Sequence, residues 1–370
     1  MQARVRAQAR VNVAAIERNV ARLRSELEAR TRLCAVVKAD GYGHGALPAA
    51  RAALAGGAAW LAVATAAEAA ALRAGGIDAR LLVLGALSSD ELDVALAADA
   101  DIVVWREEMV GAVTARGGGR VHVKLDTGMG RLGSRDVHQA DRVADAAAGA
   151  TGVELAGAMT HFATADELGD AFFGEQLMRF ASWASALRER HPGVLLHAAN
   201  SAALLRERAS HFDLVRPGVA VYGLDPFQRD AAAERLEPAL ELHSYVAEVK
   251  PCATGQSVGY GRRFVARRAT TIATVPIGYG DGLRRGLTNN AEVLVVGRRF
   301  PLVGAVSMDN VTLDLGPDGG GVSRGDEALF IGPGLPAEEM ARRLQTINYE
   351  VTCGFTARVP RHHHRDGAPG

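Results

Sequence analysis

The apolar positions of this chain recur in short runs that are separated by longer segments of helical type. Up to Ala220 the runs are Leu33–Ala39, Trp60–Thr65, Leu81–Ala86, Asp101–Trp105, Arg120–Asp126, Leu155–His161, Leu195–Asn200 and Leu214–Ala220. The segments between them are rich in alanine, leucine and arginine, as in Ser89–Ala98 and Phe173–Arg190. Buried-type strands that alternate with helices in this way predict a parallel (β/α)8 TIM barrel, whose active site lies at the carboxyl ends of its strands.

An open, doubly wound sheet is the structural alternative to a barrel. Such a sheet requires a glycine-rich nucleotide-binding turn directly after its first strand. In this sequence Lys38 stands at that place. The barrel is therefore the preferred interpretation.

The pattern changes at about Pro238. From there the strand-like segments are short, β-branched and divided by glycine-rich turns, with one helical segment at Pro336–Leu344. They are Leu240–Val249, Ala269–Pro276, Ala291–Val296, Pro301–Val306 and Val311–Leu315. This pattern predicts a mostly-β C-terminal domain. We therefore expect a barrel domain over residues 1–235 and a β domain over residues 236–370, with residues 1–13 as a candidate strand for pairing with the second domain.

Composition narrows the functional classes. The 370 residues include 42 basic and 42 acidic side chains, so no charge excess favours nucleic acid or an anionic membrane as a partner. No apolar run reaches the length of a membrane span, and no apolar signal-peptide core follows Met1. The three cysteines lack metal-ligand spacing, and the cluster Arg361–Arg365 is interpreted as a solvated basic tail. We expect a soluble, reduced, cytoplasmic protein without a metal.

The first apolar run ends in Lys38, and three glycines at alternate positions follow, with Tyr42 and a histidine between them. Partial burial at the end of a strand lowers the pKa of a lysine and makes its neutral amine available as a nucleophile. Such an amine suits Schiff-base chemistry with an aldehyde such as pyridoxal 5'-phosphate (PLP), with the phosphate near Tyr42. The alternative is a surface lysine that snorkels beside a glycine-rich loop.

Polar residues also follow the later runs. Arg131, in the turn after Arg120–Asp126, is a candidate clamp for a substrate carboxylate, because a guanidinium group matches a carboxylate in a bidentate manner. Lys124 lies in an otherwise apolar strand, where a bare ammonium group is costly. His161 ends its strand, and by itself such a histidine is more typical of a hydrogen-bonded core residue.

The turns after the seventh and eighth runs are candidates for phosphate binding, which is frequent at these places in barrels. Ser201, at a helix start after Asn200, and the backbone N–H groups of Gly218 and Val219 form a suitable anion cradle. A helix N-cap and a plain turn are the alternative for either segment alone. Arg216, just before the second turn, is expected to point toward a cofactor ring.

The second domain has prominent stretches of its own. Tyr260 and Tyr279 each lie between glycines, and Met308 ends a strand whose backbone is free to donate. Each stretch is ordinary in isolation, because tyrosines in turns are usually packing residues. Together with the segment around Tyr349 they complete a pattern that spans both domains.

That pattern resembles the PLP-dependent alanine racemases over essentially the whole chain. The segments that carry the resemblance, in family order, are the Lys38 segment, Lys124 to Arg131, His161-Phe162, Asn200-Ser201, Arg216, Gly259 to Gly261, the Tyr279 segment and Met308-Asp309. The departures are Asp40-Gly41 where Asn-Ala is frequent, and Ser307 where cysteine is common. Neither position carries chemistry.

The resemblance implies that the chain interconverts L-alanine and D-alanine through a PLP external aldimine. Lys38 is then the aldimine lysine and one base, and Tyr260 from the neighbouring subunit is the other base. Racemisation requires bases on opposite faces of a planar carbanion, since one removes the α-proton and the other returns it. Arg216 would face the pyridine nitrogen and keep it unprotonated, because a guanidinium group does not release a proton.

Further roles are implied by the same resemblance. Cofactor binding is implied for Lys38, Tyr42, His161, Asn200, Ser201, Arg216, Gly218, Val219 and Tyr349, and substrate binding for Arg131, Tyr279 and Met308. Lys124 is implied to be carbamylated, which would turn a costly buried cation into an anion that orients Arg131. The implied assembly is a homodimer with shared active sites, and the implied role is the supply of D-alanine for cell-wall peptidoglycan.

Two rival functions remain open. A non-catalytic PLP-carrier protein of the single-barrel kind lacks a second β domain, whereas this chain has one that contains Tyr260. A barrel-type amino-acid decarboxylase pairs the ring nitrogen with a carboxylate, and Arg216 argues against that pairing. Acceptance of serine, and a role in alanine catabolism or antibiotic self-protection, also stay open.

Overall fold

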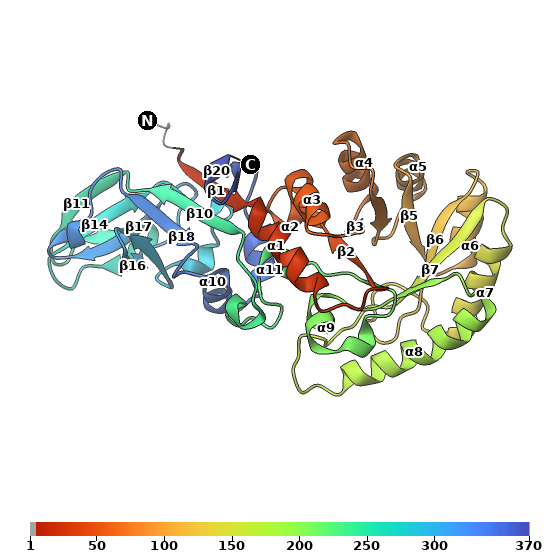
Figure 1. Ribbon diagram of the computed structural model, residues 1–370. Helices are drawn as coiled ribbons and strands as arrows, with labels where there is room; N and C mark the ends of the chain where they lie inside the picture. The colour runs from red at the N-terminus through yellow and green to blue at the C-terminus, as the bar shows by residue number, and fades with distance from the viewer. Residues whose placement is uncertain (1–4, 370) are drawn as a thin grey trace. The chain divides into compact units, whose positions relative to one another are not determined.

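The computed structural model describes residues 5–369. The chain forms two compact units. The first, here called the barrel unit, is Ile16–Glu237, and the second, the β unit, combines the residues up to Ala15 with those from Pro238 onward. Figure 1 shows both units and labels their helices and many of their strands.

A parallel sheet of eight strands forms the centre of the barrel unit within the described residues, in the order β8-β7-β6-β5-β4-β3-β2-β9. The strands are β2 (Arg32–Val36), β3 (Trp60–Val63), β4 (Arg80–Val83), β5 (Ala100–Val104), β6 (Gly119–Lys124), β7 (Val153–Met159), β8 (Leu195–His197) and β9 (Leu214–Val215). Each falls on one of the predicted apolar runs. Strands β3 and β5 are buried along their whole length, as expected when helices cover the outside of a parallel sheet.

Backbone hydrogen bonds bring the two ends of this sheet together. The N–H of Asp213 donates to the carbonyl of Leu196 at 3.0 Å, and the N–H of Arg216 donates to the carbonyl of Ala199 at 2.8 Å. Strand β9 pairs on its other side with β2. The sheet is therefore nearly closed, which confirms the predicted barrel and excludes the open, doubly wound alternative.

Helical segments precede the first barrel strand and alternate with the later strands, and one of them, α2, is a left-handed turn (Figure 1). They are α1 (Val13–Arg24), α2 (Lys38–Tyr42), α3 (Ala46–Ala55), α4 (Ala66–Ala74), α5 (Ser89–Ala97), α6 (Glu107–Thr114), α7 (Val137–Gly149), α8 (Phe172–Arg190) and α9 (Ser201–Arg206). Local chemistry determines where several of them begin. Thr65 and Ser88 each form a capping box with a glutamate three residues later, which satisfies backbone N–H groups at the start of α4 and α5.

The β unit is built on a mostly antiparallel sheet, which confirms the predicted second domain. Among the described residues its strand order is β11-β14-β17-β16-β15-β18-β10-β1-β19-β20. The strands are β1 (Ala7–Asn12), β10 (Leu240–Tyr245), β11 (Glu248–Cys252), β14 (Thr270–Val275), β15 (Ala291–Val295), β16 (Arg298–Val303), β17 (Val311–Gly316), β18 (Glu327–Ile331), β19 (Arg361–Arg365) and β20 (Ala368–Pro369). A separate hairpin joins β12 (Ser257–Val258) to β13 (Phe264–Val265), and the helices are α10 (Ala337–Leu344) and α11 (Asn348–Cys353).

The basic cluster Arg361–Arg365 corrects one expectation, because it is not a solvated tail. It forms strand β19, which pairs in parallel with β1 in the register Ala9 to Arg361. Strand β1 pairs on its other side with β10. The prediction was wrong because it used side-chain charge, whereas strand pairing depends on backbone groups that the neighbouring strand satisfies.

The predicted segment Leu240–Val249 also differs from the structure, since it contains a break between β10 and β11. The N–H of Val246 donates to the carbonyl of Asp326, and the N–H of Ala247 donates to the carbonyl of Thr274, both at 2.8 Å. These bonds direct the chain from one neighbouring strand to another. Within residues 5–369, none of the helices combines the length and apolar character that crossing a membrane requires.

Candidate active site

Lys38 is half-buried and lies one residue beyond β2, at the carboxyl end of a barrel strand. The next residues form a tight left-handed turn: Ala39, Asp40, Gly41 and Tyr42 all have φ between 52° and 62°. A left-handed conformation costs roughly 1–2 kcal/mol for each residue other than glycine. Consecutive strained residues beside a lysine are typical of a functional site rather than of a simple connection.

Two carboxylates hold this turn in place. Glu68, at the start of α4, accepts hydrogen bonds from the N–H of Ala39 at 2.7 Å and from the N–H of Ala64 at 2.8 Å. Asp40 accepts from the N–H of Ala46 at the start of α3, also at 2.8 Å. The ends of β2 and β3 are thereby joined through one glutamate, and the backbone next to Lys38 is fixed.

The predicted phosphate cradle lies between the ends of β8 and β9. Ser201 Oγ accepts from the N–H of Gly218 at 2.9 Å and from the N–H of Ala220 at 3.3 Å. Its own proton is therefore left to donate, and the N–H of Val219 has no acceptor among the described residues. A Cβ atom at Gly218 would overlap the hydroxyl group of Tyr42, so only glycine permits this approach. The donors of Ser201, Val219 and Tyr42 thus gather around one point, as an anion requires.

Arg216 is buried and held by four hydrogen-bond contacts. Its Nη2 donates to the carbonyls of Thr160 at 2.8 Å and Ala198 at 3.1 Å and lies 3.4 Å from His161 Nδ1. Its Nη1 donates to His197 Nδ1 at 2.8 Å. Burial lowers the pKa of Arg216 to about 10, which leaves the guanidinium charged at neutral pH.

The positive charge of Arg216 lowers the pKa of both Lys124 and His161. Burial and the charges of Arg216, Arg131 and Lys38 lower the pKa of Lys124 to about 8. Burial and the charge of Arg216 also hold the pKa of His161 well below its usual value, so His161 is neutral. The barrel mouth is thus rich in positive charge, which favours anionic ligands.

Arg131 lies on an exposed loop whose base is held by Asp126. The Asp126 carboxylate accepts from the N–H groups of Gly128 and Gly130 at 3.0 Å and from Arg135 Nε at 3.2 Å. Burial acts to raise the pKa of Asp126, but these hydrogen bonds outweigh it and hold the pKa below its usual value. Asp126 therefore remains an anion that shapes the loop.

Asn200 has a simpler role among the described contacts. Its Oδ1 accepts from the N–H of Ala203 at 2.9 Å and so caps helix α9. Among residues 5–369 the Asn200 side chain makes no hydrogen bond with Arg216, and its role toward a cofactor stays a prediction. Tyr349 lies in α11 of the β unit and is half-buried.

Three loops of the β unit carry the remaining predicted residues, and hydrogen bonds join the loops of Tyr279 and Met308. The N–H groups of Tyr279 and Gly280 donate to the carbonyls of Ser307 and Met308 at 3.0 and 2.9 Å. Tyr260, Tyr279 and Met308 are exposed by 74%, 43% and 51%, which is unusual for large apolar side chains. The N–H of Met308 has no acceptor among the described residues, as its predicted role requires.

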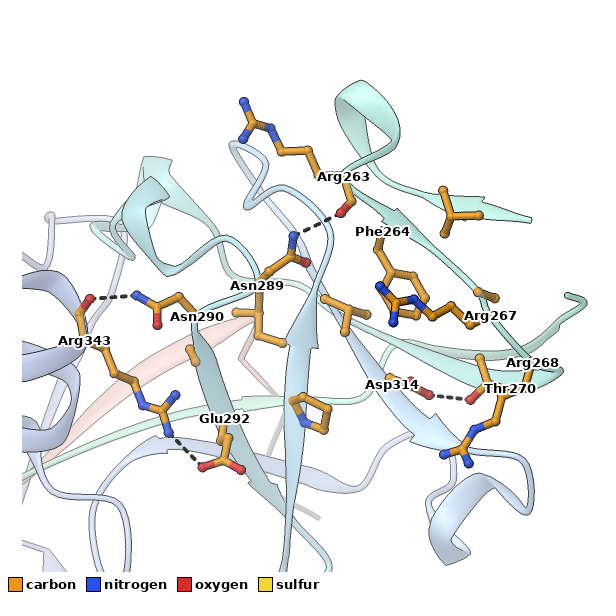
Figure 2. Close-up of a pocket in the computed structure, with 16 residues that line it drawn as sticks. Arg263, Phe264, Arg267, Arg268, Thr270, Asn289, Asn290, Glu292, Asp314 and Arg343 are labelled. Carbon is orange, nitrogen blue, oxygen red and sulfur yellow. Dashed lines mark hydrogen bonds and ion pairs between the residues drawn. The ribbon is translucent and has the colours of Figure 1, made fainter. Parts of the chain in front are cut away.

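The β unit also contains a cavity of about 820 Å³, which Figure 2 shows. It is lined by residues 263–268, by Asn289 and Asn290, and by Glu292 paired with Arg343. Among the described residues that line it there is no predicted site residue.

Sequence reasoning missed several residues that hold the site together: Glu68, Asp126, Thr160 and His197. His197, Thr160 and Asp126 had a visible signal, because each is a polar side chain within an apolar run. Glu68 acts on Ala39, which is 29 residues away in the sequence. A second overlooked signal is that the whole sequence contains only three lysines, Lys38, Lys124 and Lys250, of which two lie at the barrel mouth.

Comparison with known proteins agrees with this geometry. Residues 11–226 match the family described as alanine racemase, N-terminal domain, and residues 239–363 match alanine racemase, C-terminal domain. The chain is 45% identical over 342 residues to an alanine racemase of Frankia casuarinae, with 88% of each chain covered.

Two solved structures have the same fold. The alanine racemase of Streptomyces coelicolor A3(2) is 38% identical, with a TM-score of 0.90 over 96% of this chain and 97% of that chain. The alanine racemase of Bacillus anthracis with bound L-Ala-P is 36% identical, with a TM-score of 0.90 over 100% of this chain and 97% of that chain. Both halves of the chain are accounted for by one family. The chain belongs to the alanine racemase family of amino-acid isomerases.

Proposed function

We propose that this chain interconverts L-alanine and D-alanine and that PLP, carried on Lys38, is its cofactor. The observation that supports this proposal best is the barrel mouth, where Lys38, Arg216 and the donors around Gly218 occur on adjacent strand ends. When bound, PLP withdraws electrons from the α-carbon of an attached amino acid and so makes its α-proton removable.

The residues present fit such a cofactor. The hydroxyl groups of Ser201 and Tyr42 and the N–H of Val219 would hold a phosphate, since they converge where glycine at 218 leaves room. Arg216 would face the ring nitrogen, because its Nε–H has no acceptor among the described residues while its Nη2 hydrogens are engaged. A permanently charged donor there leaves the ring nitrogen without a proton of its own.

The chain's own residues would then move the α-proton. Lys38 Nζ serves as the base on one face of the substrate, and the Tyr260 hydroxyl serves on the other. A phenol with an ordinary pKa near 10 requires roughly 4 kcal/mol of differential stabilisation to reach a pKa near 7. Arg131 would supply part of this stabilisation while it binds the substrate carboxylate, and the N–H of Met308, which has no acceptor among the described residues, would bind the same carboxylate.

We further propose a homodimer in which Tyr260, Tyr279 and Met308 of one copy close the barrel mouth of the other. The exposure of these side chains in the single chain supports this assembly, because apolar side chains of this size are seldom left in water together. We also propose that Lys124 reacts with carbon dioxide to form a carbamate with release of a proton. A fraction of Lys124 is present as the neutral amine near neutral pH, because its pKa is lowered to about 8.

In the cell, D-alanine from this reaction would serve peptidoglycan synthesis in the cytoplasm. The alternative of a decarboxylase is disfavoured by Arg216, which stands where a carboxylate would be needed. The alternative of a PLP-carrier protein is disfavoured by the β unit and its exposed tyrosine.

The direct test incubates the purified protein with PLP and either enantiomer of alanine in D₂O. We expect each enantiomer to approach a 1:1 mixture, because the two have equal free energy, and deuterium to enter at the α-carbon. Chiral chromatography and mass spectrometry measure these changes. Release of carbon dioxide would indicate a decarboxylase, and absence of any α-deuterium would contradict catalysis.

A further inference from the structure

A continuous hydrogen-bonded chain runs through the barrel interior and ends on Arg216. His197 Nδ1 lies 2.8 Å from Arg216 Nη1, and His197 Nε2 lies 2.8 Å from His122 Nδ1. His122 Nε2 in turn lies 2.8 Å from Asp101 Oδ2. Both imidazoles and the carboxylate are fully buried. The chain begins near the amino ends of the strands, where Asp101 follows the first residue of β5, and reaches the carboxyl end, where Arg216 follows β9.

The two ends of this chain, Arg216 and Asp101, require the same direction for its hydrogen bonds. A guanidinium group can only donate, so His197 Nδ1 must accept. His197 therefore carries its proton on Nε2 and donates to His122 Nδ1. His122 must then carry its own proton on Nε2, which it donates to Asp101. Burial and the nearby charge of Arg216 hold the pKa of His197 well below its usual value, in agreement with a neutral ring.

Two arginines stabilise the ionised carboxylate of Asp101, which ends this hydrogen-bonded chain. Asp101 accepts from Arg120 Nε at 2.6 Å and forms an ion pair with Arg80 Nη2 at 2.9 Å. Burial acts to raise the pKa of Asp101, but the hydrogen bonds from His122, Arg80 and Arg120 hold it below its usual value. Asp101 therefore remains ionised and always accepts from His122, which excludes the opposite tautomer of that ring.

The backbone makes room for the two imidazoles. The register of β6 against β7 shifts between Val121 and His122, and the residue opposite His122 is Gly157. A Cβ atom at position 157 would overlap His122 Nδ1, the atom that accepts from His197. Trp60 meets the His122 ring edge-on, with centroids 5.8 Å apart. The hydrogen bond between His122 and His197 therefore requires both the shift in strand register and the glycine at position 157.

We infer that His122 and Asp101 are positioning residues for Arg216. They confine both imidazoles to the Nε2–H tautomer, so that Arg216 always meets an acceptor at His197 and holds one orientation. The other tautomer of His197 would place an N–H against the Nη1–H of Arg216, and two donors at that distance would force the guanidinium to move. The inference rests on the proposed function, since the orientation matters only if Arg216 faces a cofactor ring.

The main experiment reads the tautomers directly. Histidine labelled with ¹⁵N is incorporated into the PLP-loaded protein, and long-range ¹H–¹⁵N spectra distinguish Nε2–H from Nδ1–H rings. His122→Leu and His197→Gln variants assign the two signals. We expect Nε2–H for both rings. An Nδ1–H signal for either ring in the unsubstituted protein would overturn the inference, whether or not any variant folds and whether or not alanine is the substrate.

The kinetic experiment compares two substitutions of one residue. His122→Leu removes the acceptor for His197, and we expect kcat for alanine to fall by about 10- to 100-fold with little change in KM. The same variant should show a fraction of Nδ1–H at His197, because only Arg216 then opposes that tautomer. His122→Asn offers Oδ1 near the former Nδ1 position, and we expect it to recover most of kcat and the Nε2–H signal of His197.

These outcomes separate the inference from the proposed function. If the unsubstituted protein does not racemise alanine, the proposed function fails while the tautomer result stands by itself. If it does racemise alanine and a folded His122→Leu variant keeps both kcat and the Nε2–H signal, the positioning role is wrong. Equal losses of kcat in the leucine and asparagine variants, with an unchanged His197 tautomer, would also contradict it.

Discussion

The Tyr42 hydroxyl lies so close to Gly218 that a methyl group at position 218 would overlap it. Tyr42 belongs to the left-handed turn after Lys38, and Gly218 belongs to the turn after β9. The contact therefore joins the first and last strands of the barrel at the point where phosphate binding is proposed. Strand β2 pairs directly with β9 in the register that makes this approach possible.

Replacing Gly218 with alanine tests this relationship. We expect the free energy of unfolding to fall by about 1–3 kcal/mol, because an extra methyl group must displace Tyr42. We also expect PLP to bind at least about tenfold more weakly, a difference of roughly 1.4 kcal/mol. Urea unfolding and a fluorescence titration with PLP measure the two effects. Gly174→Ala in helix α8 is the matched control, since its Cβ would meet no atom within 4 Å.

Borohydride reduction tests the assignment of Lys38. The three lysines lie in separate parts of the chain, so a reduced cofactor on any of them is easily located by peptide mass spectrometry. We expect the added mass on the peptide that contains Lys38. A label on Lys124 or Lys250 would refute the assignment, and Lys38→Ala should remove the label while the protein stays folded.

The lowered pKa of Lys124 predicts a pH dependence of stability in apoprotein freed of carbon dioxide. The folded-state pKa is about 8, below the ordinary value of 10.5, so the unfolded chain binds more protons between these values. The free energy of unfolding should therefore rise from pH 8 to 10.5 relative to a Lys124→Met variant. Over this pH range, the whole shift of the Lys124 pKa corresponds to a rise of about 3 kcal/mol in the free energy of unfolding. If the free energies of unfolding of the two proteins change with pH in the same way, the lowered pKa of Lys124 is wrong.

The control for this measurement is a lysine that lacks these neighbouring charges. Arg216, Arg131 and Lys38 lower the pKa of Lys124, whereas Asp126 raises it. Lys250→Met removes an exposed lysine and should leave the profile unchanged. In the presence of ¹³C-labelled bicarbonate, a carbamate carbon signal should appear and should be lost in Lys124→Met.

Arg216→Glu tests the role of the buried guanidinium. A carboxylate at this position favours a protonated ring nitrogen in bound PLP, so negative charge is held longer and amino transfer to the cofactor competes with racemisation. We expect racemisation to fall by at least about 10²-fold and pyruvate to appear. Chiral chromatography and a coupled pyruvate assay follow both products. Normal racemisation without pyruvate would show that Arg216 has no electronic role.

Mixing subunits tests the shared active site. Lys38→Ala and Tyr260→Phe proteins should each be nearly inactive, because each lacks one base. After subunit exchange, half of the dimers are hybrids with one intact site of two, so about a quarter of the unsubstituted activity should return. Native mass spectrometry confirms the exchange. If hybrids form and activity does not return, Tyr260 acts within its own chain.

The sequence by itself indicated the barrel strands and supplied the candidate reactive residues, whose roles stay predictions. Burial of parallel strands leaves apolar runs in the sequence, so all the barrel strands could be predicted from local pattern. The position of Lys38 after the first run, and the glycines around Tyr260 and Tyr279, indicated these residues as candidates for the chemistry. These signals are local, because each depends on residues that are neighbours in the chain.

The tertiary structure decided the contacts between distant segments. Asp101, His122 and His197 lie on three different strands, and only the barrel register brings them within hydrogen-bond distance of one another and of Arg216. The basic segment Arg361–Arg365 became a strand because β1 presents an open edge to it. Pairing and proton direction depend on which backbone or side-chain group a neighbour offers, and a one-dimensional pattern of polarity does not contain that information.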